Sequence, residues 1–260
     1  MEGKFYKIRS SLNQLVLGVA RDDPNPGSQV AFFDECCTDG QLWYDDVITG
    51  RVRCKLNDYC LEITPDEASL RPYNSNEYNQ KWTVTDDRVC HQDQDSLVMD
   101  VAASRTEPGS PICCWEFHGG PNQLMAKEYQ PAKPMYIVSQ MNGKVMDVDW
   151  AKTDPGTKVI MYDKHGEAAD NQLWYEDRYG IIHTKLNDFV LDFDDGHIRI
   201  NPYDPNKSSQ QWFFSEHTIR NKEDKNMVID IEGGSRRNGA DLVQWEYSGD
   251  SNQLWTPEYI

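Results

Sequence analysis

The sequence lacks any apolar run long enough to span a bilayer, and its first residues lack the apolar segment of a secretory signal. A membrane-spanning helix needs about 20 predominantly apolar residues, whereas residues 1–8 mix charged and apolar side chains. We therefore expect a cytoplasmic protein, or one that is exported by a route other than a signal peptide in this chain.

Basic residues are also few. The 260 residues include 26 Lys and Arg against 43 Asp and Glu, for a net charge of −17. The excess is even, since residues 1–132 carry 12 basic and 21 acidic residues (−9) and residues 133–260 carry 14 and 22 (−8). With no basic patch to neutralise phosphates, nucleic acid and anionic membranes are poor candidates as partners.

Cysteine is absent from the second half of the chain, although that half repeats the pattern of the first. The seven cysteines are Cys36, Cys37, Cys54, Cys60, Cys90, Cys113 and Cys114. A disulfide framework therefore cannot be what the fold depends on, and free thiols are expected, with a bond from Cys36 or Cys37 to Cys60 left open. No Cys or His set has zinc spacing, so the sequence predicts neither a metal site nor a cofactor.

Amphipathic helix patterns are missing as well. Short β-type segments occur at residues 5–9, 15–20, 29–33 and 51–56, and turn-forming residues such as 22–27 (Asp-Asp-Pro-Asn-Pro-Gly) separate them. Short strands at roughly ten-residue spacing predict an all-β barrel or sandwich.

What the chain does contain is an internal repeat. Six triplets of Gln-x-(aromatic or apolar) begin at Gln41, Gln80, Gln123, Gln172, Gln211 and Gln253, at intervals of 39, 43, 49, 39 and 42. Three such units cannot bury their apolar faces singly, so they are expected to pack about a pseudo-threefold axis in a closed β structure. The pattern restarts after Pro131 and Pro134, which predicts two domains, residues 1–131 and 132–260.

These motifs resemble a known family. Three repeats per domain, each ending in Gln-x-Trp or a variant of it, resemble the ricin B-type (R-type) lectins, and the doubled form resembles the tandem-repeat galactose-binding lectins of earthworms. The matching segments are residues 143–148 (Gly-Lys-Val-Met-Asp-Val), 171–174 (Asn-Gln-Leu-Trp), 185–189 (Lys-Leu-Asn-Asp-Phe) and 118–123 (His-Gly-Gly-Pro-Asn-Gln). The resemblance implies two tandem β-trefoil domains that bind galactose-type sugars.

Most tryptophans are expected in the core, because large aromatic anchors of repeated motifs are usually buried. The last position of the triplet holds Trp43, Trp82, Trp174, Trp212 and Trp255 in five repeats and Met125 in the remaining one, the third. Three tryptophans remain outside it, namely Trp115, Trp150 and Trp245.

A sugar site of the implied kind needs a carboxylate that accepts hydrogen bonds from two hydroxyls. It also needs an aromatic face against the apolar side of the sugar ring and an Asn amide that donates and accepts. The neighbouring Gln is expected to orient the carboxylate. Three repeats have the complete set: Asp100, Trp115, Asn122 and Gln123 in the third; Asp147, Tyr162, Asn171 and Gln172 in the fourth; and Asp230, Trp245, Asn252 and Gln253 in the sixth.

The other repeats are incomplete. The first has Gly18 and Gly40 at the carboxylate and Asn positions, so that Phe33 would stack without a polar partner. The second has Glu62 and Asn79-Gln80 but no Gly-to-aromatic segment, and the fifth keeps Asp192 with Gln210-Gln211. We expect all three to be structural.

Two histidines add a finer distinction. His118 follows Trp115 by three residues, and His165 follows Tyr162 by three, whereas the sixth repeat has Ser248 there. The family resemblance implies that His118, and with it His165, contributes to the sugar, while the alternative is ordinary loop polarity. If they do contact sugar, binding at those sites weakens as pH falls through about 6.5, and a flat profile between pH 5 and 8 would contradict it.

The sequence therefore predicts a multivalent, metal-independent lectin for terminal galactose or N-acetylgalactosamine on glycoproteins or glycolipids, able to cross-link or agglutinate. A glycosidase would need two carboxylates across one bond, and each repeat supplies one, so an enzyme is not expected. A β-trefoil protein-interaction module with vestigial sugar sites is the alternative.

Overall fold

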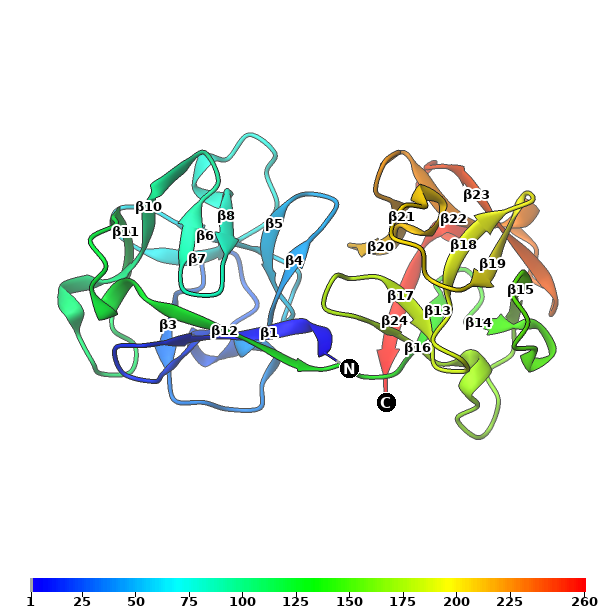
Figure 1. Ribbon diagram of the computed structural model, residues 1–260, viewed down its shortest axis with the longest axis horizontal. Helices are drawn as coiled ribbons and strands as arrows, with labels where there is room; N and C mark the ends of the chain where they lie inside the picture. Colours follow the sequence, from blue (N-terminus) through cyan, green and yellow to red (C-terminus); the bar gives the residue numbers. More distant parts are fainter. Residues whose placement is uncertain (1) are drawn as a thin grey trace. The chain divides into compact units, whose positions relative to one another are not determined.

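The computed structural model describes residues 2–260, and within them it contains β-strands and ten three-residue 3-10 turns but no α-helix. The chain divides into two compact units, residues 4–130 and residues 131–260 together with residues 2 and 3 (Figure 1). The expected all-β fold of two tandem β-trefoils is confirmed. The domain limits 1–131 and 132–260 remain our proposal.

Within residues 2–260 each of the two units has twelve strands, four per repeat. The first unit contains β1 (Glu2–Ser10), β2 (Val16–Val19), β3 (Val30–Phe33), β4 (Trp43–Asp46), β5 (Arg51–Cys54), β6 (Cys60–Ile63), β7 (Ala68–Arg71), β8 (Trp82–Val84), β9 (Val89–His91), β10 (Gln94–Val101), β11 (Ile112–Glu116) and β12 (Met125–Pro131). The second contains β13 (Met135–Ser139), β14 (Val145–Val148), β15 (Thr157–Tyr162), β16 (Trp174–Glu176), β17 (Ile182–Thr184), β18 (Val190–Asp194), β19 (His197–Asn201), β20 (Trp212–Ser215), β21 (Thr218–Asn221), β22 (Met227–Ile231), β23 (Ala240–Glu246) and β24 (Trp255–Tyr259).

The strand pairs within the repeats are antiparallel, and one pattern recurs in all six. The second and third strands form a hairpin, as in β2–β3, β10–β11 and β22–β23. The first strand of a unit pairs with the last, β1 with β12 and β13 with β24, which closes each unit on itself. Such closure leaves no open sheet edge between the first and last strands of the unit.

A 3-10 turn precedes the fourth strand of each repeat and ends on the glutamine of the triplet. These turns are η2 (Asp39–Gln41), η3 (Tyr78–Gln80), η5 (Pro121–Gln123), η7 (Asp170–Gln172), η8 (Ser208–Gln210) and η10 (Ser251–Gln253). The fifth triplet therefore begins at Gln210, and the sequence-based assignment to Gln211 was wrong by one residue.

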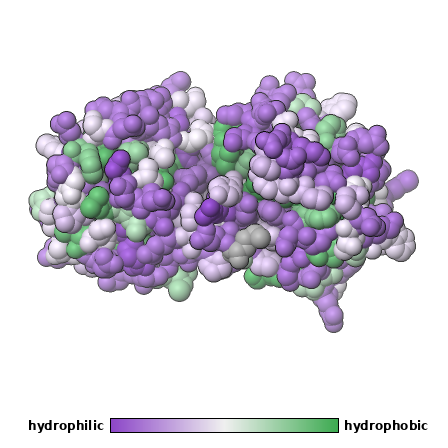
Figure 2. Space-filling model, viewed as in Figure 1, coloured by the Kyte–Doolittle hydropathy of each residue, from purple (hydrophilic) through white to green (hydrophobic). Residues whose placement is uncertain are grey.

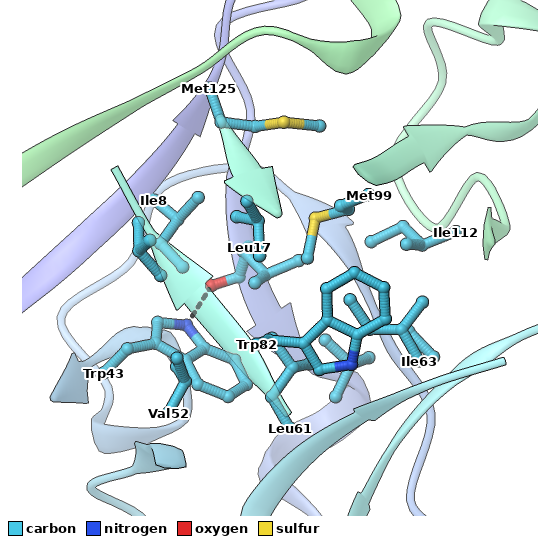
Figure 3. Packing of buried hydrophobic residues seen from close by; sticks show 14 of the residues in the cluster. Ile8, Leu17, Trp43, Val52, Leu61, Ile63, Trp82, Met99, Ile112 and Met125 are labelled. Atoms are coloured by element: carbon cyan, nitrogen blue, oxygen red, sulfur yellow. Dashed lines mark hydrogen bonds between the residues drawn. The ribbon is translucent and has the colours of Figure 1, made fainter. Parts of the chain in front are cut away.

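The aromatic residues of the triplets open the fourth strands and fill the cores. Trp43, Trp82, Trp174, Trp212 and Trp255 are each at most 1 % exposed, as is Met125. Figure 3 shows the first core, where Trp43 and Trp82 pack among aliphatic side chains of several strands. The expected core role of these residues is confirmed.

The indole N–H of each buried tryptophan is satisfied within its own repeat. Trp43 Nε1 donates to the carbonyl oxygen of Leu17 at 3.0 Å (Figure 3), and Trp174 and Trp255 donate in the same way to the second strand of their repeats. Trp82 and Trp212 instead donate to carbonyls of the preceding turn, Asn79 and Ser209. The second and fifth repeats thus differ from the others already in how the core is anchored.

The state of the cysteines agrees with a fold that does not depend on disulfides. All seven cysteines lie within the described residues and carry free thiols.

Hydrophilic residues dominate the face shown in Figure 2, and hydrophobic ones occur there in small groups. Within residues 2–260 the structure holds no helix long and apolar enough to cross a membrane.

Candidate functional site

The third repeat brings its four predicted residues together beside the β10–β11 hairpin. Asn122 Nδ2 donates to both carboxylate oxygens of Asp100 at 2.9 Å, and Gln123 Nε2 donates to Asp100 Oδ2 at 2.9 Å. Asp100 is 6 % exposed, whereas Trp115 on β11 is 60 % exposed. A fixed carboxylate and an open aromatic ring therefore share one cavity, about 440 Å³ in volume.

The fourth repeat repeats this arrangement with tyrosine as the aromatic residue. Asn171 Nδ2 donates to Asp147 Oδ1 at 2.8 Å, and Gln172 Nε2 donates to Asp147 Oδ2 at 2.7 Å. Tyr162 is 38 % exposed at the end of β15. Asp147, Tyr162 and Asn171 line a cavity of about 570 Å³.

The sixth repeat holds the same set on β22, β23 and η10. Asn252 Nδ2 donates to both oxygens of Asp230 at 2.9 Å, and Gln253 Nε2 donates to Asp230 Oδ2 at 2.8 Å. Trp245 is 63 % exposed. Three independent segments of the chain thus build one geometry, which makes an accidental arrangement an unsatisfactory explanation.

The glutamines lie behind the carboxylates. Gln123, Gln172 and Gln253 are fully buried, so they act on a ligand only through the aspartate. Each also joins the aspartate to the loop after the aromatic residue: Gln172 Nε2 donates to the Asp163 carbonyl at 3.0 Å, and its Oε1 accepts from the His165 backbone N–H at 2.9 Å. These hydrogen bonds fix the position of the loop relative to the carboxylate.

Burial alters the acidity of two of the carboxylates. Loss of water around Asp147 and Asp230 raises the pKa of each above its usual value, and the hydrogen bonds from the neighbouring Gln and Asn oppose that effect in part. An ionised carboxylate in such a place has few competing water molecules. It is therefore a strong hydrogen-bond acceptor for a ligand hydroxyl.

The two predicted histidines lie at the rims of their cavities. His118 Nε2 is 3.7 Å from Asp100 Oδ2, and His165 Nε2 is 4.0 Å from Asp147 Oδ2. Both side chains are about half exposed, and the His165 ring meets the Tyr162 ring edge to face at 5.8 Å between centroids. In the sixth repeat Ser248 Oγ donates to Asp250 instead.

In the first repeat, neighbouring side chains occupy the space beside the two glycines that replace the Asp and Asn of the complete sites. At Gly18 a side chain would meet Gln41 Cγ at 2.8 Å, and at Gly40 it would meet Asp22 Oδ1 at 2.0 Å. The Asp22 carboxylate therefore occupies space beside the position that Asn holds in the complete sites. Gln41 keeps its structural role by donating to the Asp34 carbonyl at 2.8 Å.

Of the complete set, the second and fifth repeats keep only the glutamine and the carboxylate to which it donates. Gln80 Nε2 donates to Glu62 Oε2 at 3.1 Å and Gln210 Nε2 donates to Asp192 Oδ2 at 2.9 Å. Asn79 bonds to Glu77 and not to Glu62. Since the triplet starts at Gln210, the Asn position of the fifth repeat is Ser209, which corrects the expected Gln210-Gln211 pair.

A second 3-10 turn distinguishes the three complete repeats and the first repeat from the second and fifth. It follows the second strand in the first, third, fourth and sixth repeats, as η1 (Ala20–Asp22), η4 (Ala102–Ser104), η6 (Asp149–Ala151) and η9 (Glu232–Gly234). In the described second and fifth repeats the hairpins β6–β7 and β18–β19 close directly without it. The aromatic segment that the sequence lacked there is missing because the hairpin is shorter.

Several residues that line the cavities were not assigned to a site from the sequence, among them one tryptophan, one asparagine and one cysteine. Trp150 and Asn238 line the fourth-repeat cavity, and Cys113 lines the third-repeat cavity. The sequence marked Trp150 only as a tryptophan outside the triplets. Asn238 comes from the sixth repeat, and no motif in the sequence around it predicts a place in the fourth-repeat cavity. Within residues 2–260 no group of three or more His, Cys, Asp or Glu is placed to hold a metal ion.

Fold and site together define a β-trefoil of the lectin class. The model of the ricin-type beta-trefoil lectin domain matches residues 4–124 and 133–255, so the chain belongs to that family and is a carbohydrate-binding protein. No curated protein matches the chain.

Several solved structures are similar to it. The C-half of the earthworm R-type lectin in complex with GalNAc is 40 % identical over 49 % of this chain and 99 % of its own, with a TM-score of 0.48. A mutant of the earthworm lectin C-terminal domain in complex with 6'-sialyllactose is 37 % identical with the same coverage and a TM-score of 0.46. A non-toxic homologue of type II RIPs from bitter gourd, in complex with α-methyl-D-galactoside, is 16 % identical over 100 % of this chain and 98 % of its own, with a TM-score of 0.45.

Proposed function

We propose that the chain is a metal-independent lectin for terminal galactose or N-acetylgalactosamine, with one site in each of the third, fourth and sixth repeats. The observation that carries this proposal is the repeated set of a buried, hydrogen-bonded aspartate beneath an exposed aromatic ring. The aspartate accepts hydrogen bonds from two neighbouring hydroxyls, and the ring covers the apolar C–H face of the sugar.

The Asn side chain completes the selection of the sugar. Its Nδ2 is committed to the aspartate in all three sites, and its Oδ1 stays available to accept a hydrogen bond. An axial hydroxyl at C4, as in galactose, reaches between the aspartate and the Asn while the opposite ring face stacks on the aromatic side chain. Glucose-type sugars with an equatorial C4 hydroxyl lose one of these contacts.

Hydrolysis is not part of the proposal. A glycosidase places two carboxyl groups about 5 to 10 Å apart across the scissile bond. One carboxylate, that of Asp100, lines the third-repeat cavity. Asp149 lines the fourth-repeat cavity together with Asp147, but the residue at its place in the third repeat is Ala102, so the arrangement that the two sites share has a single carboxylate. We infer that the sites bind glycans without cleaving them.

Calorimetric titration with lactose tests the proposal, with maltose as the control sugar and EDTA in a parallel run. We expect saturation near three sites per chain with lactose, no change with EDTA and no heat with maltose. The triple variant Asp100→Asn, Asp147→Asn, Asp230→Asn should lose the lactose signal. No heat with either sugar would favour a protein-interaction module instead.

A further inference from the structure

Trp150 is an exposed aromatic residue that the three-part site does not use. It lies in η6, three residues after Asp147, and its side chain is 84 % exposed. It lines the same cavity as Asp147, Tyr162 and Asn171. An apolar surface of this size gains free energy when a ligand covers it.

The backbone at Trp150 makes the choice of residue unusual. Its φ is 55°, in the left-handed region, where a bulky side chain is a rare outlier and glycine is favoured. The equivalent residues adopt the same conformation, with φ of 55° at Ala103 and 60° at Gly233. The conformation thus belongs to the repeat, while the tryptophan belongs to the fourth site alone among the three complete ones. Arg21 has a φ of 61° at the equivalent place of the first repeat, which has no complete site, so the backbone conformation alone does not assign a function. The function assigned to Trp150 depends on its exposure and on its place beside Asp147 in the cavity.

A second wall of this cavity comes from the sixth repeat. Asn238 Nδ2 donates to Asp163 Oδ2 at 2.8 Å, and Asn238 Oδ1 accepts from Lys144 Nζ at 2.6 Å. The next residue, Gly239, donates its backbone N–H to the Met161 carbonyl at 2.8 Å. Asn238 is therefore held in place at the rim, and the cavity has about 570 Å³ against about 440 Å³ in the third repeat.

We propose that Trp150 forms a second aromatic subsite, which stacks the sugar residue linked to the terminal galactose. This inference rests on the proposed function. The third site has its aspartate, aromatic ring and Asn with only Ala103 at the Trp150 position, so a terminal sugar does not need this side chain. The fourth site accordingly selects galactose-terminated disaccharides and longer glycans over free galactose, whereas the third does not.

The test uses the full chain with one site left intact. In an Asp100→Asn, Asp230→Asn background only the fourth site remains, and lactose should bind about fivefold more tightly than galactose, equivalent to about 1 kcal/mol. Adding Trp150→Ala should bring that ratio close to one, and Trp150→Phe should retain most of it. Lys152→Ala, an exposed change just outside η6, serves as the matched control and should keep the ratio.

The reverse exchange provides a gain of selectivity. In an Asp147→Asn, Asp230→Asn background the third site remains, and Ala103→Trp should raise its ratio of lactose to galactose affinity. Galactose binding with no preference for lactose at the fourth site, or a Trp150→Ala effect that is equal for both sugars, would overturn the subsite. Absence of binding to both sugars at both sites would overturn the proposed lectin function itself.

Discussion

At the scale of single residues, the strand that carries a tryptophan decides what the residue does. Trp174 opens β16, is fully buried and donates its indole N–H to the Met146 carbonyl at 3.2 Å, whereas Trp245 on β23 is 63 % exposed. Sequence spacing separated these two groups correctly, because the triplet marks the core position. It gave no role to Trp150, whose importance depends on a backbone conformation and on neighbours from another repeat.

The two kinds of tryptophan should respond differently to truncation. Trp174→Ala should lower the free energy of unfolding by about 3–5 kcal/mol, because it leaves a cavity and an unpaired carbonyl in the core. Trp245→Ala should change it by no more than about 0.5 kcal/mol. Urea unfolding of both variants measures the difference, and comparable losses would contradict the assignment of Trp245 to the surface.

Acidic pH should weaken binding through the buried aspartates. The sugar hydroxyls need the ionised carboxylate, and burial raises the pKa of Asp230 in the free protein above its usual value of 3.8. Binding should therefore be constant at neutral pH and should fall as pH drops through this raised pKa, with protons released on binding in that range. Below it, the protonated carboxyl keeps its place in the free protein, since burial favours the neutral form.

The sixth site separates this effect from histidine titration, because Ser248 stands where the other sites have His118 and His165. In an Asp100→Asn, Asp147→Asn background, lactose calorimetry in two buffers of different ionisation enthalpy counts the released protons. Binding that already declines near pH 6.5 at this site would argue against the carboxylate as the titrating group.

At the scale of elements, the short turns are where sequence patterns are least informative. The strand expected at residues 5–9 lies within β1, and the one expected at residues 51–56 contains β5. The fifth triplet was misplaced at Gln211, although a Gln-x-Trp triplet that ends on Trp212 begins at Gln210. The structure agrees with that count: Gln210 is 1 % exposed and bonds to Asp192, whereas the Gln211 side chain donates to the Pro205 carbonyl. No sequence pattern had indicated the 3-10 turn in which Gln210 lies.

The glutamine that ends each turn should be structural in every repeat but functional in only three. Gln172→Ala removes the donors to Asp147 and to the Asp163 carbonyl, and should cost about 1–3 kcal/mol of stability. It should also weaken lactose binding at the fourth site by about tenfold, because the Asp147 carboxylate is no longer held in position. A tenfold loss corresponds to about 1.4 kcal/mol of binding free energy.

Gln210→Ala is the matched control, because Gln210 makes the same two kinds of bond, to Asp192 and to the Pro202 carbonyl. It should cost similar stability and leave lactose affinity unchanged. Thermal unfolding and calorimetry on the variant that retains only the fourth site compare the two. Equal losses of binding would show that the effect of Gln172→Ala is a general weakening of the fold.

At the scale of the whole molecule, repetition made the fold predictable and also limited what could be predicted of the sites. Six recurrences of one motif specify strands, turns and closure redundantly, so that one misplaced triplet did not change the architecture. Asn238 lines the fourth-repeat cavity although it belongs to the sixth repeat. Its position there results from closure of the unit, so it could not be predicted from the sequence of either repeat. The same holds for the shortened hairpins of the second and fifth repeats.

The distribution of sites should determine whether the chain cross-links glycans. The proposed fourth and sixth sites lie in one compact unit and the third lies in the other. Individually shallow sites gain strength when several engage clustered glycans together. Asp100→Asn, which leaves two sites, should still precipitate a multivalent galactosylated glycoprotein, at a higher concentration of chain than the parent requires.

The double variant Asp147→Asn, Asp230→Asn leaves one site and should bind free lactose without precipitating the glycoprotein, because one site per chain cannot bridge two ligands. Light scattering follows precipitation, and calorimetry with lactose confirms that the remaining site is occupied. If this variant cross-linked as well as the parent, either a further site among the incomplete repeats or association of chains would supply the missing valency. Sedimentation of the variant in lactose would then distinguish these, because chain association changes the mass of the particle whereas an extra site does not.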